Sequence, residues 1–156
     1  MTLRSLLAKD WVVEVNTGDT ADPTWTPIKG LTEFAEEINT ETEDDSDFDD
    51  DGWASQVVTQ RGWTLTLNGN RKRDNEAVTF VPDPGQEYLR QAGHVVGPGA
   101  NVHVRWYRRD GAPDAYEGRA AVEYKGAGGE TTDLEPFEVE LLGQGKPVEI
   151  DNPVAA

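Results

Sequence analysis

The sequence contains no cysteine in its 156 residues. Disulfides, thiolate metal sites and a thiol nucleophile are therefore excluded. No apolar run approaches the roughly 20 residues that a membrane-spanning helix needs, and the apolar start is too short for a secretory signal. A chain of this length can bury a hydrophobic core that is stable without disulfides or structural metal ions. We expect one β domain over residues 1–150 and a flexible end over residues 151–156.

Basic residues are also scarce. Lysine and arginine total 14 against 30 acidic residues, which gives a net charge of -16. A surface of this sign repels phosphate backbones, so tight nucleic-acid binding is excluded. His94 and His103 are the only histidines, and their spacing, across an expected helix end and a strand, does not favour a metal site. Serine-nucleophile and phosphate-loop motifs are lacking too, and we expect no cofactor.

The abundant acidic residues are concentrated in one block. Eight of the eleven positions from Glu41 to Asp51 are acidic. Bare carboxylates lose hydration when they are buried, and like charges in a row extend the backbone. The block is therefore predicted to project from the domain over residues 40–53, as the tip of a hairpin or as a crossover.

The rest of the chain alternates apolar and polar residues at the period of β-strands. Residues 63–67 are the clearest case, because Trp63, Leu65 and Leu67 share one face while threonines take the other. One short helix is expected over residues 83–93, with Asp83 as its N-cap. The prediction is a mainly β fold, a sandwich or partial barrel with one flanking helix. Its expected strands are 10–16, 25–30, 33–40, 53–67, 101–109, 115–125, 134–142 and 146–150.

Two alternative functions depend on carboxylates. Asp47, Asp49, Asp51 and Gly52 match the first positions of a calcium-binding loop. The twelfth position, which should be a bidentate glutamate, is Val58. A calcium-stabilised β-sandwich binding module is therefore the second hypothesis. A hydrolase that uses two carboxylates is the third, although nothing distinguishes one pair among so many acids.

The order of the motifs indicates a family. Trp25-Thr-Pro-Ile-Lys-Gly30 leads into Leu31-Thr-Glu-Phe34; the acidic block with Trp53, a long Thr/Val/Trp strand and Arg71-Lys-Arg73 follow. This order, carried by residues 24–73, resembles the major tail tube proteins of long-tailed, non-contractile bacteriophages, especially those of actinobacterial hosts. The resemblance implies a non-enzymatic virion protein with the tail tube fold, assembled in the host cytoplasm. No appended immunoglobulin-like domain is expected.

The resemblance also implies partners. Hexameric rings of such proteins stack into a tube around a tape-measure protein, between a terminator and the distal tail or baseplate proteins, and DNA leaves through the lumen. The family's long loop reaches a neighbouring subunit, where it becomes ordered. The residues expected in that self-assembly loop are Glu41, Glu43, Asp44, Asp45, Asp47, Phe48, Asp49, Asp50, Asp51 and Trp53.

Two further groups of residues are candidates for roles in such a tube. The basic stretch Arg71, Lys72 and Arg73 is the expected acceptor of the loop, with Arg105, Arg108 and Arg109 as a second cluster. Glu138 and Glu140 alternate with apolar residues, so they are predicted to face the lumen or the exterior of the tube.

Overall fold

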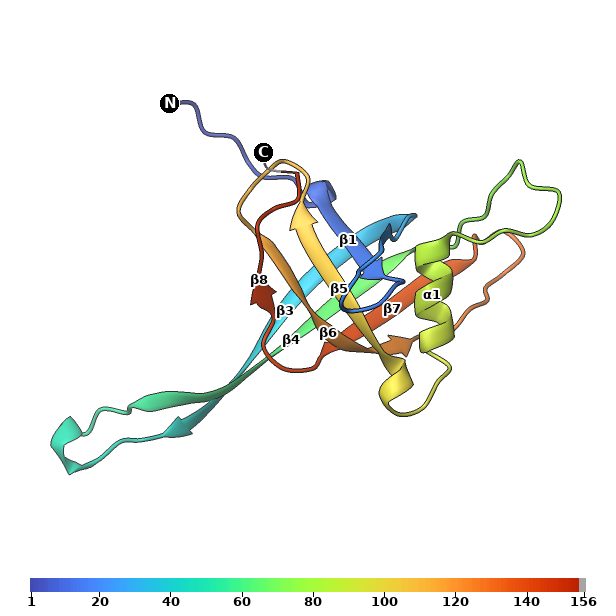
Figure 1. Cartoon of the computed structure of the whole chain (residues 1–156). Helices are drawn as coiled ribbons and strands as arrows, with labels where there is room; N and C mark the ends of the chain where they lie inside the picture. Colours follow the sequence, from blue (N-terminus) through green and yellow to red (C-terminus); the bar gives the residue numbers. More distant parts are fainter. Residues whose placement is uncertain (155–156) are drawn as a thin grey trace.

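The strands of the protein form a single antiparallel sheet with one α-helix, as a computed structural model that describes residues 1–154 shows (Figure 1). Along the sheet the strand order is β2-β1-β5-β6-β7-β4-β3, and β8 pairs with β6. The elements are β1 Trp11–Asn16, β2 Trp25–Pro27, β3 Leu31–Asp44, β4 Gln56–Asn70, α1 Pro84–Ala92, β5 Asn101–Arg108, β6 Ala115–Tyr124, β7 Pro136–Gly143, β8 Val148–Glu149 and the short 3-10 helices η1 Ala8–Asp10, η2 Phe48–Asp50 and η3 Pro98–Ala100.

The sheet curls, so that side chains of β1, next to one edge, contact side chains of β3 at the other edge. In a flat sheet, β1 and β3 would lie about 24 Å apart, at roughly 4.8 Å for each of five steps. The rings of Trp11 on β1 and Phe34 on β3 instead have centroids 5.0 Å apart. Trp63 on β4 and Trp106 on β5 approach to 4.9 Å in the same way. The predicted mainly β fold is therefore confirmed, and its form is that of a partial barrel.

The inner face of this curled sheet forms the core. Trp63, Leu65 and Leu67 are buried on β4 and the threonines between them face outward, as the alternation predicts. Gly143 makes room for Trp63, because a Cβ at this position would lie 2.4 Å from the indole ring. The other buried core residues include Val13, Val15, Val102, Val104, Trp106, Ala120, Val122, Phe137, Val139 and Leu141.

Helix α1 closes one side of the barrel. Asp83 caps it as predicted, because its carboxylate accepts a hydrogen bond from the backbone N–H of Gln86. Leu89 is fully buried and Ala92 nearly so, whereas Tyr88, expected on the same stripe, is 36% exposed. Gln86 is buried, and its amide donates hydrogen bonds to the carbonyls of Lys29 and Asn70. The helix therefore joins the end of β4 to the start of β3.

The structure differs from the sequence expectations at several strand ends and at the C-terminus. Strand β4 covers Gln56–Asn70 instead of residues 53–67, because the acidic loop continues to residue 55. Strand β3 extends to Asp44 instead of ending at residue 40, because its backbone is hydrogen-bonded to β4 even where its side chains are acidic. The second strand ends at Pro27, not at residue 30. Residues 151–156 were expected to be flexible, but Asn152 is buried and donates hydrogen bonds to the carbonyls of Arg108 and Ala112. This residue is therefore part of the folded domain. Residues 155–156 lie outside the described part of the chain. In residues 1–154, no helix has the length and apolar character to cross a bilayer.

Candidate assembly surfaces

The acidic block lies at the end of a two-stranded arm. Strands β3 and β4 stay paired from Leu31↔Gly69 to Asp44↔Gln56, with a bulge opposite Glu41 and Thr42. Strand β4 pairs with β7 only from Thr64 to Asn70, so the distal part of the hairpin, residues 39–62, has no third strand. Figure 1 shows this distal part, hereafter the arm, projecting far from the barrel. The predicted hairpin is confirmed, and the loop that joins its strands covers only residues 45–55.

Carboxylates organise the backbone at the tip of the arm. The side chain of Asp47 accepts a hydrogen bond from the backbone N–H of Asp49 at 2.9 Å, and the N–H of Asp47 donates to the Asp50 carboxylate at 2.8 Å. This capping box begins the short helix η2 and leaves Phe48 fully exposed and Trp53 80% exposed. The tip thus presents two aromatic side chains among acids.

The remaining acids of the arm are exposed to solvent. Asp44 accepts a hydrogen bond from the N–H of Ser46 at 2.8 Å, and hydrogen bonds from Ser46 lower the pKa of its carboxyl. Residues Glu41 to Asp51 are exposed except Asp50, which is half-buried. All ten predicted loop residues lie on the distal arm. Within residues 1–154, no group of three or more acidic or histidine side chains has the geometry of a metal site. Asp47, the first residue of the calcium-like motif, instead serves as a helix cap.

The predicted basic acceptor lies at the other end of β4. Residues Arg71 to Arg73 follow its last residue, Asn70, whereas the tip of the arm precedes its first, Gln56. Fifteen residues in a strand span about 45 Å at roughly 3.3 Å each. Arm and acceptor therefore cannot pair within one molecule, and any contact between them joins two copies.

The environment of this basic stretch is partly set by helix α1. The N–H of Lys72 donates to the side-chain oxygen of Gln86 at 2.9 Å, and Arg71 lies 3.9 Å from the Glu87 carboxylate. Arg73 is exposed, and its guanidinium lies 5.0 Å from the ring centre of Phe80. The backbone is thus anchored, while the charged ends of Lys72 and Arg73 stay accessible.

The second expected basic cluster does not form a surface. Arg105 is paired with Glu14, with 2.7 Å between Nη2 and Oε1. Arg108 is buried and paired with Asp110 at 2.9 Å, and this hydrogen-bonded pair lowers the pKa of the Asp110 carboxyl. Only Arg109 of the three is exposed and free of salt bridges in the described residues. Alternation in a strand does not reveal which cations are neutralised by acids from other strands.

Glu138 and Glu140 lie on the outer face of β7, opposite the buried Phe137, Val139 and Leu141. Glu140 lies 3.3 Å from the amino group of Lys125, to which Glu123 of β6 also pairs at 2.8 Å. The register of β6, β7, β4 and β3 places further polar residues on this face, namely Thr64, Thr66, Asn68, Glu33 and Glu37. The predicted acids therefore belong to a four-stranded face that is polar and mainly negative.

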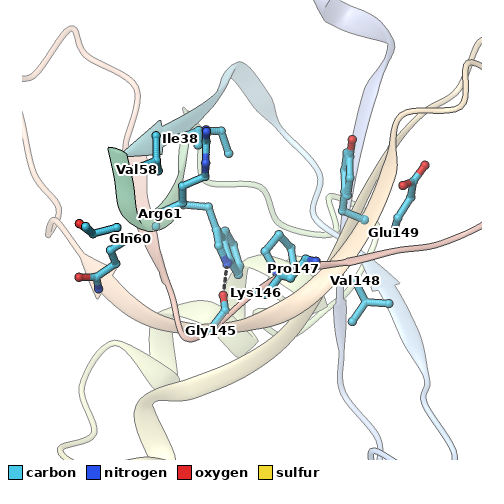
Figure 2. A pocket seen from close by; sticks show the side chains of 13 residues that line it. Ile38, Val58, Gln60, Arg61, Gly145, Lys146, Pro147, Val148 and Glu149 are labelled. Atoms are coloured by element: carbon cyan, nitrogen blue, oxygen red, sulfur yellow. Dashed lines mark hydrogen bonds between the residues drawn. The ribbon is translucent and has the colours of Figure 1, made fainter. Parts of the chain in front are cut away.

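A groove at the base of the arm was not predicted from the sequence. It has a volume of about 890 Å³ and lies between the arm and residues 145–149 (Figure 2). The indole N–H of Trp63 donates to the carbonyl of Gly145 at 2.8 Å and holds the two sides together. Ile38, Val58 and Val148 line it although each is about half exposed. The sequence does not indicate that these short apolar segments from separate strands lie next to each other in the fold.

The fold was compared with known proteins. No protein-family model matches the sequence, and no curated protein does. Among solved structures, a chain in the tail of an empty gene transfer agent particle, determined with C6 symmetry, superposes with a TM-score of 0.64 at 16% identity, covering 94% of this chain and 99% of that chain. A chain of the SPP1 tail tube gives a TM-score of 0.64 at 9% identity, covering 95% and 81%. The chain has the tail tube fold. A chain in the virion of a native gene transfer agent particle agrees, with a TM-score of 0.62 at 16% identity over 92% and 97% of the two chains.

Proposed function

We propose that this chain is a structural, non-enzymatic subunit of a phage tail tube, in which hexameric rings stack into a hollow conduit for DNA. The observation that carries the proposal is the match over 94% of the chain to a subunit of a tail with C6 symmetry. The sequence resemblance in residues 24–73 extends it to long-tailed, non-contractile phages of actinobacterial hosts. It also supports location in the virion after assembly in the host cytoplasm, a tape-measure protein in the lumen, and terminator and distal tail proteins at the tube ends.

The outer face of β6, β7, β4 and β3 is suited to line the lumen. Four strands from each of six copies make a closed barrel of about 24 strands, which is wide enough to leave a channel. Glu138 and Glu140 then face passing DNA. Carboxylates repel phosphates over about 8 Å at physiological salt, so DNA slides without binding to the wall.

The arm is suited to join stacked rings. Its acidic tip and the basic residues 71–73 lie at opposite ends of β4, and contacts between unlike surfaces of identical subunits propagate as open filaments. The exposed Phe48 and Trp53 supply apolar contacts that offset the entropy of ordering the tip. The calcium-module alternative is not favoured, because Asp47 is engaged in capping η2.

Negative-stain microscopy of the concentrated protein tests this function. Rings or tubes are expected, and a folded protein that stays monomeric at every concentration would contradict the proposal. Thermal melting with calcium and with a chelator provides a second comparison. A melting temperature independent of calcium is expected, whereas a large rise with calcium favours the binding module.

A further inference from the structure

A second projecting segment lies at the end of the barrel opposite the arm. Residues 74–81, hereafter the apolar loop, are closed by a hydrogen bond of 2.8 Å from the N–H of Asp74 to the carbonyl of Val81. Arg73 and Pro82 form an isolated bridge beneath it. Val78 at its tip is fully exposed, and Phe80 is 59% exposed. Apolar side chains projecting on a closed loop are typical of a contact surface.

The groove at the base of the arm has a complementary apolar lining. Val58 comes from the arm and Ile38 from β3 just before it, Pro147 precedes β8 and Val148 is the first residue of β8, and the buried Trp63 lies between them. Figure 2 shows the labelled arm side chains on one side of the groove and those of residues 145–149 on the other. An apolar side chain can therefore enter between two walls.

The charges of the two surfaces also match. Arg61 and Lys146 line the groove, and neither takes part in a salt bridge within the described residues. Glu149 is the one acid of the lining. The apolar loop carries Asp74 and Glu76 beside its apolar tip. Opposite charges around an apolar contact favour one partner and one orientation.

The two surfaces cannot meet in one molecule. The groove lies beside Trp63 and the arm. The apolar loop follows the far end of β4, at Asn70, on the side of the barrel away from the arm (Figure 1). Between two copies, the distances along the chain allow this contact to form together with the proposed contact between the arm and the basic residues 71–73. Val78 lies five positions from Arg73, and Arg61 lies five positions from Gln56, which pairs with Asp44, so each segment can span at most about 16 Å. Docking the loop in the groove is therefore compatible with a contact between the basic stretch and the acids of the arm.

We propose that the groove at the base of the arm receives the apolar loop of a second copy of this chain, with Val78 between the apolar walls and Glu76 near Arg61 and Lys146. This inference rests on the proposed function and names the contact that seats one ring on the next. The exposed N-terminal leucines are a poorer occupant, because residues 1–9 contain no acid that could pair with Arg61 and Lys146, whereas the apolar loop carries Asp74 and Glu76.

Engineered cysteines test the contact directly, since the natural chain has none. The double variant Val78→Cys/Val148→Cys is assembled, oxidised and run on a non-reducing gel. A ladder of covalent multimers is expected, because each copy links to two neighbours. The control Val78→Cys/Leu134→Cys pairs two exposed positions that do not face each other in the proposed contact, and should give dimers at most. Absence of the ladder in assembled tubes overturns the inference, as does a ladder from Leu6→Cys/Val148→Cys or Phe48→Cys/Val148→Cys.

Charge reversal provides the second test. Arg61→Glu should raise the concentration needed for half-maximal assembly by about tenfold or more, and adding Glu76→Arg to the same chain should restore most of it. Normal assembly of Arg61→Glu, or failure of Glu76→Arg to rescue it, overturns the proposed contact. If the natural protein still forms tubes, the proposed function stands even though the contact is wrong. If the natural protein forms neither rings nor tubes, the proposed function fails as well.

Discussion

The β3–β4 hairpin has two halves, one inside the barrel and one forming the arm. Both are paired antiparallel strands, but their surroundings differ. One antiparallel pairing, interrupted by a single bulge at Glu41 and Thr42, runs from Phe34↔Leu67 to Asp44↔Gln56. Leu65 and Leu67 near the base are fully buried, whereas Val57 on the arm is 47% exposed. A two-stranded hairpin without a third strand is only marginally stable in water. The comparison shows that the barrel half stabilises the monomer and that the arm half is available for contacts with other molecules.

Neutralising the arm should have the largest effect on assembly. Replacing Asp44, Asp45, Asp47, Asp49, Asp50 and Asp51 with asparagine removes six of the eight negative charges of residues 41–51, and asparagine can still cap η2. The monomer should melt normally while tube growth is abolished, as measured by sedimentation at concentrations where the natural protein polymerises. Replacing the exposed Asp19 and Asp22 serves as the control. Tubes of normal length from the arm variant would remove the arm from the joining contact.

Two alanine substitutions within β4 compare the stability contributed by the barrel half of the hairpin with that contributed by the arm half. Leu65→Ala should lower the free energy of unfolding by about 2–5 kcal/mol, because it leaves a cavity in the core. Val57→Ala should change it by less than about 1 kcal/mol, as expected for a half-exposed side chain. Denaturant unfolding of the monomers measures both. Equal losses in the two variants would show that the arm is part of the folded core.

A third prediction concerns the outer face of the barrel half. Glu138→Lys/Glu140→Lys should leave rings and tubes intact but slow DNA ejection, because lysine binds phosphate. The neutral variant Glu138→Gln/Glu140→Gln separates loss of repulsion from new attraction and should have a smaller effect. Ejection kinetics of phages carrying each variant provide the measurement. Unchanged kinetics in the lysine variant would place this face away from the lumen.

The smallest expected effect depends on pH. Asn16 accepts two backbone hydrogen bonds through its amide oxygen, so its NH₂ group donates to Nδ1 of His103 at 3.2 Å. That contact requires a neutral ring, and burial lowers the pKa of His103 below its ordinary value of 6.5. The unfolded chain therefore binds the proton more readily. The stability from neutral His103 is present above pH 6.5 and is lost as the pH falls through the lower pKa of the folded protein.

Unfolding curves at neutral and mildly acidic pH measure this effect. His103→Gln should lose less stability on acidification than the natural protein does, and His94→Gln controls for replacing an exposed histidine. An equal loss in the natural protein and His103→Gln would contradict the assignment.

Much of this structure was predictable where local rules apply. The alternation of Trp63, Leu65 and Leu67 identified the core face of β4, and Asp83 identified the start of the helix. The acidic block had to be exposed for electrostatic reasons alone. Strand ends were less predictable, because backbone pairing continued through acidic residues to Asp44.

The sequence by itself determined the strand faces, the single helix and the exposure of the acidic block, since these depend on residues near each other in the chain. Tertiary structure decided which distant residues meet. The curl of the sheet brings Trp11 to Phe34, the β1–β5 register pairs Arg105 with Glu14, and the return of the chain at residues 145–149 forms the groove between Val58 and Val148. Strand β4 separates the arm from the basic residues 71–73, because they lie at its opposite ends. Such contacts depend on strand order and curvature, which the alternation of side chains does not encode.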